Sequence, residues 1–262
     1  MSPSDEAVLR IDDLTMHFGG IKAVDGISLE VLPRQVHSLI GPNGSGKSTT
    51  INVLSGLYMP TSGAVTFCGH DITTAKPHKR VQLGMARTFQ NIRLFKELSV
   101  LDNVMVGRHA RMHANLVTLL VAPGARREEA EARERAMEEL RFLGLLDEAH
   151  LPAGSLSYGH QRLVEIARAL SSDPALLLLD EPAAGLNPFE TGQLDEFLRA
   201  ITERDVSTVL VEHDMNLVME LSDHITVLNF GKKIASGAPS AIQDDPEVIA
   251  AYLGTPEEVS HA

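Results

Sequence analysis

The chain has 262 residues, 44% of them hydrophobic and 22% charged, which is ordinary for a globular protein. Its net charge of −12 argues against a general basic surface for nucleic acid or anionic lipid. The single cysteine, Cys68, excludes an internal disulfide framework, favours a reducing compartment, and is expected to be a small buried residue. The acidic N-terminus lacks the apolar core of a secretory signal, and the longest apolar run, Leu116–Ala122, is far shorter than a membrane span. We therefore expect a cytosolic protein, in which any membrane role must come through a partner.

Short alternating segments occupy residues 7–33 on both sides of Gly19-Gly20. Alternation of apolar and polar residues between turn signals predicts strands, so we expect a small antiparallel sheet laid against the core that follows. Phe18 stands just before the glycine pair. Its position is equally consistent with an ordinary aromatic residue and with a ring that stacks on a purine.

Residues 35–57 carry the most informative pattern of the chain. The apolar residues Val36, Leu39 and Ile40 lead into the glycine-rich segment Gly41–Ser48, and apolar residues then recur at helical spacing. The pattern predicts strand, loop and helix, and the loop matches the phosphate-binding P-loop, whose glycines let backbone N–H groups face a phosphate chain. Lys47 is placed to reach the β- and γ-phosphates, and Ser48 offers a hydroxyl to Mg²⁺. The residues expected to bind the nucleoside triphosphate here are Gly41, Asn43, Gly44, Ser45, Gly46, Lys47, Ser48 and Thr49.

Two more strands are expected before the middle of the chain, at Ala64–Cys68 and at Gly84–Gln90. A polar side chain at the carboxyl end of a strand in an open α/β sheet faces the ligand crevice. Gln90 is therefore a candidate contact of Mg²⁺ or of the attacking water. Position alone does not separate this role from an ordinary surface glutamine.

The pattern from residue 91 to about residue 155 is helical, and we expect a helical subdomain inserted into the α/β core. Ser99 and Asp102 resemble a capping box, and Pro123-Gly124 separates a first helix from a second. Opposite charges recur at four-residue spacing along the second helix, in the pairs Arg127–Glu131, Glu129–Arg133 and Glu131–Arg135.

Apolar residues at the start of this region, Leu94, Phe95 and Leu98, allow two interpretations. They suit packing in the core, and they also suit a groove that receives a helix of a partner protein.

A second candidate anion site follows, because Ser157 and Gly159 precede a helical pattern. The apolar run Ala175–Leu179 then predicts a strand buried on both faces, and it ends in Asp180-Glu181. In a phosphate site, Asp180 would hold Mg²⁺ directly or through water. Glu181 would orient the attacking water or accept its proton.

The remaining residues complete an α/β pattern. A turn at Ala183–Pro188 precedes a helix over residues 190–203, and Ser207–Val211 predicts another buried strand. His213 follows that strand, in a position to touch a γ-phosphate. Residues 223–228 and 232–236 are expected to pair as a hairpin, and residues 246–253 to form a helix.

In this order the segments resemble the ATPase subunit of ABC transporters, over about residues 8–254. The matching segments are Gly41–Ser48, Gln90, the signature Leu156–His160, Asp180–Glu181, the D-loop Gly185–Pro188 and the switch histidine His213. The resemblance implies ATP and Mg²⁺ as ligands, with Phe18 stacked on adenine and with Ser157 and Gly159 at the γ-phosphate. It implies Ser48, Gln90 and Asp180 as metal ligands. It also implies that Glu181, His213 and Gln90 act in hydrolysis.

The chain departs from the family pattern in two places. The signature reads LSYGH, with Tyr158 and His160 at positions where glycine and glutamine are usual, and the D-loop has Asn187 in place of aspartate. Ser157 and Gly159 are kept, so a functional site is expected. The departures leave its turnover rate open.

Within the family, ARTFQNIRLFKELSVLDNVMVGRH and VEHDMNLVMELSDHITVLNFGKKIASGAP resemble the importers of branched-chain, hydrophobic amino acids. Importers of urea or short amides share much of this pattern, so the solute stays open. The resemblance implies a head-to-tail pair of ATPase subunits, identical or related, in which each ATP lies between one P-loop and the partner's Ser157–Gly159. It further implies two multi-span permease subunits, contacted through the helical insert after Gln90 at the inner face of the membrane, and an external solute-binding protein.

We therefore predict an α/β fold of the P-loop NTPase, ABC ATPase type, with an N-terminal antiparallel β-subdomain. Residues 7–90 and 156–240 would form the nucleotide-binding core, residues 91–155 the helical subdomain and residues 241–262 a C-terminal helical tail. The alternatives are a lipid or polysaccharide exporter subunit, a soluble ABC ATPase and a regulator that binds ATP without hydrolysis. The acidic chain with one ATPase unit disfavours the soluble class, and Glu181 and His213 disfavour the regulator.

Overall fold

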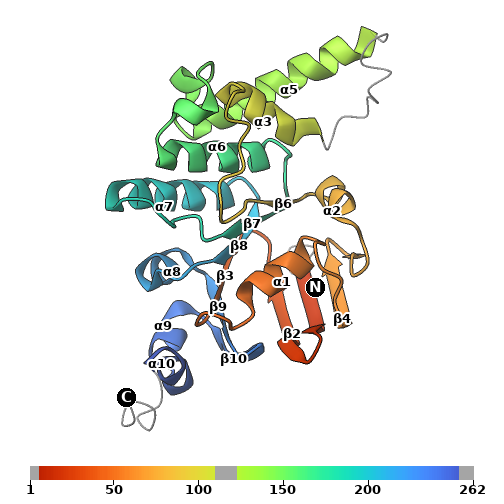
Figure 1. Cartoon of the computed structure of the whole chain (residues 1–262), viewed down its shortest axis with the longest axis vertical. Coiled ribbons are helices and arrows are strands. Elements are labelled where there is room, and N and C mark those ends of the chain that lie inside the picture. The colour runs from red at the N-terminus through yellow and green to blue at the C-terminus, as the bar shows by residue number, and fades with distance from the viewer. Residues whose placement is uncertain (1–5, 110–122, 254–262) are drawn as a thin grey trace.

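The computed structural model describes residues 6–109 and 123–253. The molecule contains two sheets, one antiparallel and one mostly parallel, and a group of helices. These parts follow one another along the long axis (Figure 1). The apolar run Leu116–Ala122 and the last part of the expected tail, residues 254–262, lie outside the described residues.

The first sheet contains four antiparallel strands in the order β2-β1-β4-β5. They are β1 (Leu9–Phe18), β2 (Ile21–Val31), β4 (Ser62–Phe67) and β5 (His70–Asp71). The turn between β1 and β2 uses Gly19 at φ 57°, a left-handed conformation that suits glycine. The antiparallel sheet predicted at the N-terminal end of the chain is therefore confirmed.

The second sheet has six strands in the order β10-β9-β3-β8-β7-β6. They are β3 (Val36–Ile40), β6 (Met85–Arg87), β7 (Leu176–Asp180), β8 (Ser207–Val211), β9 (His224–Asn229) and β10 (Lys232–Gly237). All neighbours are parallel except β9 and β10, which form the expected hairpin. Parallel strands bring their carboxyl ends to one edge, and the segments after β3, β6, β7 and β8 therefore meet there.

The leucines of β7 explain how one strand serves two cores. Successive side chains of a strand point to opposite faces. Leu176 and Leu178 pack with the antiparallel sheet and the first helix, whereas Leu177 and Leu179 pack with the helices on the other face. All of β7 is buried, as predicted for a strand covered on both sides.

Helices cover both faces of the parallel sheet. The helix α1 (Lys47–Leu54) lies between the two sheets, and α10 (Pro246–Leu253) lies at the opposite end of the molecule from α5 (Pro123–Phe142) (Figure 1). The other helices of the core are α2 (Pro77–Leu83), α6 (Tyr158–Leu170), α7 (Pro188–Thr202), α8 (Met215–Leu221), α9 (Pro239–Gln243) and α10 (Pro246–Leu253). The short helices α2, α8 and α9 had no counterpart among the predicted elements.

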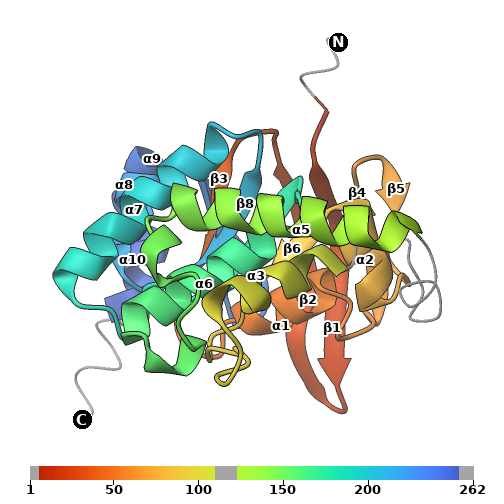
Figure 2. The ribbon, with the colours of Figure 1, turned by 90° about the horizontal axis from the view of Figure 1, so that it is seen from above.

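The remaining helices form one end of the molecule, seen closest to the viewer in Figure 2. They are α3 (Val100–Arg108), α5 (Pro123–Phe142) and the 3₁₀ turns η3 (Leu146–Glu148) and η4 (Ala153–Ser155). The Ser99 hydroxyl accepts the Asp102 N–H at 3.0 Å, so the predicted cap is confirmed. The boundaries proposed for the subdomains stay predictions.

Four local predictions are wrong. Residues 91–99 form a loop rather than part of a helix. The strand expected to reach Gln90 ends at Arg87, because buried Arg162 binds the carbonyl oxygens of Phe89 and Gln90, each at 2.7 Å. Cys68 is exposed, at a turn residue with φ 47°. Arg135 turns to Glu138 and Asp173 rather than Glu131, whereas the predicted pair Arg127–Glu131 is present at 2.9 Å.

Candidate functional site

The glycine-rich loop joins β3 to α1 as predicted, and two of its glycines are required by space. A Cβ atom on Gly41 would lie 2.1 Å from the Leu228 carbonyl oxygen, and one on Gly46 would lie 2.5 Å from the Ala23 carbonyl oxygen. Gly46 also has φ 107° and immediately precedes the first residue of α1. The backbone N–H groups at the start of α1 therefore face a cavity, and no side chain of these glycines covers them.

This cavity has a volume of ≈ 440 Å³ and lies at the carboxyl edge of the parallel sheet. Its lining residues are Phe18, Ile21, Lys22, Ala23, Asn43, Gly44, Ser45, Gly46, Lys47, Ser48, Thr49, Glu181 and Phe230. Phe18 packs edge-to-face on Tyr58, with ring centroids 5.3 Å apart. Sequence reasoning missed Lys22 and Phe230, since both stand next to turns and carry no motif of their own.

Lys47 and Ser45 are buried polar residues that line the cavity. Lys47 is 7% exposed, and its Nζ donates to the carbonyl oxygens of Gly41 at 2.6 Å and Pro42 at 3.0 Å. Burial lowers the pKa of Lys47, and the carboxylates of Glu181 and Asp180 oppose that shift. Ser45 Oγ is buried and has no hydrogen-bond partner among the described residues. A buried cation beside an unpaired hydroxyl and free N–H groups fits an anionic phosphate chain.

Asp180, at the end of β7, is held by an arginine that sequence reasoning did not single out. Arg87 Nη2 lies 3.0 Å from Asp180 Oδ2, and both side chains are largely buried. Arg87 Nη1 also donates to Asn52 Oδ1 at 2.7 Å and to Ser55 Oγ at 2.8 Å, both on the last turns of α1 or just after it. Burial raises the pKa of Asp180, and Arg87 opposes that rise. The arginine therefore links the carboxylate to the helix that follows the P-loop.

Glu181 and Gln90 come together although 91 positions separate them. Gln90 Nε2 donates to Glu181 Oε2 at 2.7 Å. Glu181 has φ 48°, a left-handed conformation that costs energy in a residue with a side chain, and its N–H is held by the Val211 carbonyl oxygen at 2.8 Å. The strained backbone places the Glu181 side chain on the wall of the cavity.

Among its described residues, the site does not contain the cluster of His, Cys, Asp and Glu side chains that usually holds a structural metal ion. Within residues 6–109 and 123–253 no three His, Cys, Asp or Glu side chains come together as a metal site. Ser48 and Glu181 line the cavity, whereas Asp180 and Gln90 do not line it but adjoin Glu181, Asp180 as its chain neighbour and Gln90 as its hydrogen-bond partner. This sparse oxygen set fits Mg²⁺, which binds through one or two protein oxygens together with phosphate and water.

The described residues that line the cavity do not include His213, Ser157 or Gly159. The His213 side chain is 66% exposed, with Nδ1 3.6 Å from Oε2 of the buried Glu212. Glu212 also accepts the N–H groups of Ala183 at 2.8 Å and His213 at 3.1 Å, and burial raises its pKa. Glu212 thus ties the turn after Glu181 to the turn that carries His213, a link that no sequence motif indicated.

The signature segment forms the start of α6 instead. The Ser157 hydroxyl accepts the His160 N–H at 3.2 Å, and His160 Nδ1 contacts Glu148 at 2.9 Å. A Cβ atom on Gly159 would lie 2.4 Å from Glu190 Oε1, so this glycine allows a close approach of α7. Asn187 accepts the N–H groups of residues 189 and 190 at 3.0 Å and caps α7. Within this chain Asn187 therefore serves as the N-cap of α7.

Comparison with known proteins places these features in context. The ABC transporter family model matches residues 24–184, and the model of branched-chain amino acid ATP-binding cassette transporters matches residues 232–258. The chain is 47% identical over 249 residues to the high-affinity branched-chain amino acid transport ATP-binding protein BraF of Pseudomonas aeruginosa, covering 94% of this chain and 98% of BraF. It is 43% identical over 251 residues to LivG of Escherichia coli K12, with 95% and 98% covered. A crystal structure of a nucleotide-free ATP-binding cassette from an ABC transporter superimposes with a TM-score of 0.84 at 34% identity, covering 95% of this chain and all of that one.

Proposed function

The chain belongs to the ABC transporter family of ATP-binding proteins, and from this premise we propose that it hydrolyses ATP to power import of branched-chain, hydrophobic amino acids. The observation that carries the ATPase activity is one cavity lined by the P-loop, Phe18 and Glu181, with Gln90 hydrogen-bonded to Glu181. The cargo is supported by the relatives, whose names state branched-chain amino acid transport, and by the C-terminal match over residues 232–258.

ATP binding follows from the cavity. The N–H groups of Gly44 to Thr49 surround the phosphates at the α1 N-terminus, and the Lys47 ammonium group leaves the Gly41 and Pro42 carbonyl oxygens for the β- and γ-phosphates. Phe18, held by Tyr58, stacks on the adenine ring. Asn43 and Ser45 complete the polar contacts of the loop.

The metal site consists of Ser48, Asp180 and Gln90. These residues would hold Mg²⁺, which would supply positive charge to neutralise and orient the phosphates. Asp180 is poised for this role because Arg87 keeps it in place at the end of β7. Gln90 is hydrogen-bonded to Glu181, so a ligand that draws on its amide also affects Glu181.

Glu181 is the general base. Its carboxylate lies on the cavity wall, where it orients water and accepts a proton as the γ-phosphate is attacked. His213 acts at the γ-phosphate from the turn after β8. The buried Glu212 holds this turn against Ala183, so a movement of either turn is transmitted to the other.

The second half of each site comes from another ATPase subunit. Ser157 and Gly159 lie at the start of α6, with N–H groups of a helix N-terminus to offer, and they do not line the cavity of their own chain. In a head-to-tail pair they face the γ-phosphate of the partner. In this arrangement each ATP contacts both subunits and so holds them together.

Attachment to the membrane runs through permease subunits. No helix in the two described stretches of the chain is long and apolar enough to cross a bilayer. Phe95 and Leu98, in the loop after Gln90, are 54% and 42% exposed and offer an apolar contact to a permease helix. The loop also joins Gln90 to α3, so closure of the ATP site moves the permease contact. The protein thus lies at the inner face of the membrane.

Uptake of radiolabelled leucine tests the proposal in the source cells. Deletion of the chain should abolish high-affinity uptake, wild type should restore it, and Lys47→Ala should not. Uptake that survives deletion, or that Lys47→Ala restores, would refute the ATP-driven import of this cargo. Labelled urea, measured in the same cells, separates the two solute classes.

A further inference from the structure

The ring of Tyr158, the first residue of α6, packs on the turn that follows Glu181. A Cβ atom on Gly185 would lie 3.1 Å from Tyr158 Cε1 and 3.5 Å from Cζ, so the ring occupies the space that a side chain at position 185 would need. Gly185 has φ 81°, a left-handed conformation that suits glycine. The ring is 45% exposed, so only part of its surface is used in this contact.

A second close approach joins α6 to the other end of this turn. A Cβ atom on Gly159 would lie 2.4 Å from Glu190 Oε1, and Glu190 Oε2 accepts the Asn187 N–H at 3.0 Å. The start of α6 therefore contacts the turn twice, through the Tyr158 ring at Gly185 and through Gly159 at the beginning of α7. The position of the turn depends on both contacts.

The other neighbour of the Tyr158 ring is a buried arginine one helical turn later. The Arg162 guanidinium carbon lies 6.0 Å from the ring centroid, and Nη2 lies 3.4 Å from Tyr158 Oη. At this distance the hydrogen bond is long, so packing of the ring contributes more than the hydroxyl does. The same guanidinium donates to the carbonyl oxygens of Phe89 and Gln90, each at 2.7 Å. Tyr158 thus lies between the turn and the group that holds the Gln90 backbone.

These contacts form a closed path that includes Glu181. Gln90 Nε2 donates to Glu181 Oε2 at 2.7 Å, and the Ala184 N–H donates to the Glu181 carbonyl oxygen at 3.2 Å. The path runs through Glu181, Gln90, Arg162, Tyr158, Gly185 and Ala184. Its other links are hydrogen bonds of 3.2 Å or less and one peptide bond, so removal of the Tyr158 ring would open the path between Arg162 and Gly185.

We propose that Tyr158 is a positioning residue for ATP hydrolysis. Its ring fixes the turn after Glu181 relative to the segment that carries Gln90, and it thereby keeps the Glu181 carboxylate in place for the attacking water. Tyr158 is not among the described residues that line the ATP cavity of its own chain, so it acts on the rate and not on ATP binding. The inference rests on the proposed function, because it concerns the general base of the same site.

The test is steady-state ATP hydrolysis by the full chain with Tyr158→Ala, which removes the ring. Small displacements of a catalytic group lower the rate strongly, so kcat should fall by about 10-fold. The Kd and the KM for ATP should stay at the wild-type values. Tyr158→Phe keeps the ring and should restore the wild-type kcat, because it loses only the long contact with Arg162.

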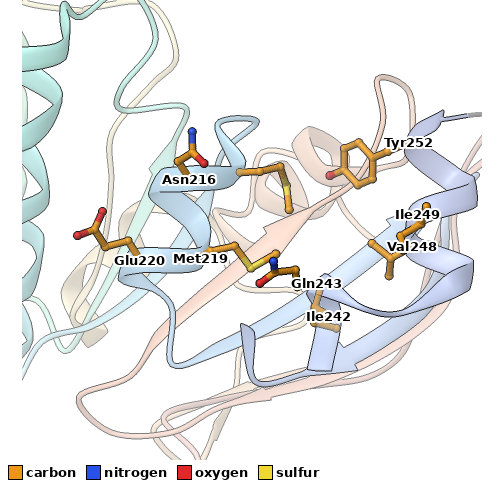
Figure 3. Close-up of a pocket in the computed structure, with 9 residues that line it drawn as sticks. Asn216, Met219, Glu220, Ile242, Gln243, Val248, Ile249 and Tyr252 are labelled. Atoms are coloured by element: carbon orange, nitrogen blue, oxygen red, sulfur yellow. The ribbon is translucent and has the colours of Figure 1, made fainter. Parts of the chain in front are cut away.

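The matched control is Ile249→Ala, which truncates a side chain of the same exposed fraction, 45%. Ile249 lies in a groove between α8, α9 and α10 (Figure 3), and among the described residues this groove shares no lining residue with the ATP cavity. Its kcat should equal that of wild type. All rates are compared at a temperature at which thermal unfolding shows every variant to be folded.

Tyr158 also belongs to the segment that the partner subunit's ATP would contact, so dimer closure is measured separately. In a Glu181→Gln background, ATP-dependent dimerisation in size-exclusion chromatography should be the same with and without Tyr158→Ala. Loss of this dimerisation would assign the effect to the partner's site and overturn the inference.

Two kinetic results would also overturn it. One is a wild-type kcat in Tyr158→Ala, and the other is a Tyr158→Phe variant as slow as Tyr158→Ala, which would assign the effect to the hydroxyl. If wild type itself hydrolyses no ATP, the proposed function fails. Wild-type hydrolysis together with an unaffected Tyr158→Ala removes only the role of Tyr158.

Discussion

Acidification from pH 7 to pH 5 is expected to destabilise the folded chain, and His37 accounts for a calculable part of this loss. His37 lies in β3 and is 1% exposed, with Nε2 2.9 Å from Thr226 Oγ1. Burial, and then the nearby ring of His224 with its centroid at 5.0 Å, lower the pKa of His37 from 6.5 to about 3. Below pH 6.5 the unfolded chain therefore binds a proton at His37 that the folded chain does not.

The size of this effect follows from the two pKa values. Each proton bound only by the unfolded state lowers stability by about 1.4 kcal/mol per pH unit. Integrated from pH 7 to pH 5, with 6.5 for the unfolded chain, the loss is about 1.9 kcal/mol. Any folded pKa below about 4 gives nearly the same result, because the folded imidazole is then neutral throughout this range.

Urea unfolding at pH 7 and pH 5 measures this contribution. In His37→Gln the loss of unfolding free energy between the two pH values should be smaller than in wild type by about 2 kcal/mol. His70→Gln, which removes an exposed imidazole from β5, is the control and should behave as wild type. Buried carboxylates such as Asp180 and Glu212 have raised pKa values and act in the opposite direction, but they are common to all three proteins. An unchanged pH dependence in His37→Gln would refute the reasoning.

Four further predictions concern the ATP site. Lys47→Ala should weaken ATP binding by about 10- to 100-fold, the range of charge-assisted hydrogen bonds, and near-normal affinity in a calorimetric titration would count against its role. Glu181→Gln should keep ATP binding and stabilise the closed dimer, with turnover lowered by about 10²- to 10⁴-fold; a normal rate of phosphate release would show that another group is the base. Arg87→Leu leaves Asp180 buried without its cation and should cost about 3–5 kcal/mol in urea unfolding, and a loss under about 1 kcal/mol would contradict the pairing. Phe18→Ala should weaken binding of ATP by about 1–3 kcal/mol, with equal affinity of the variant and wild type excluding a stacked base.

The P-loop shows why part of the site could be predicted from residue order. Its strand, glycines and helix are neighbours in the chain, so their conformations depend on local preferences of the backbone. Gly41 and Gly46 stand where the structure leaves no space for a side chain. The buried run of β7 was predictable for a similar reason, because an uninterrupted apolar strand is stable only when both faces are covered.

Local patterns failed where a distant residue changed the course of the chain. The extended segment after Ala86 suggested a strand to Gln90, but Arg162, on α6, takes the carbonyl oxygens of Phe89 and Gln90 out of the sheet. Arg135 was expected to pair with Glu131, yet it binds Glu138 on its own helix and Asp173 from the loop before β7, each at 2.6 Å. The intrinsic preference of a segment for helix or strand is weak, and tertiary hydrogen bonds and ion pairs of this kind outweigh it.

The sequence by itself determined the class of protein, the strand-loop-helix that accepts phosphate and the carboxylates that follow β7. Only the tertiary structure decided which other residues meet them: Lys22 and Phe230 at the cavity and Arg87 on Asp180. The physical reason is the range of the interactions. Backbone conformation and hydrophobic periodicity act over a few neighbouring residues, whereas the partners of a buried charge or an N–H group are set by how strands and helices far apart in the chain pack together.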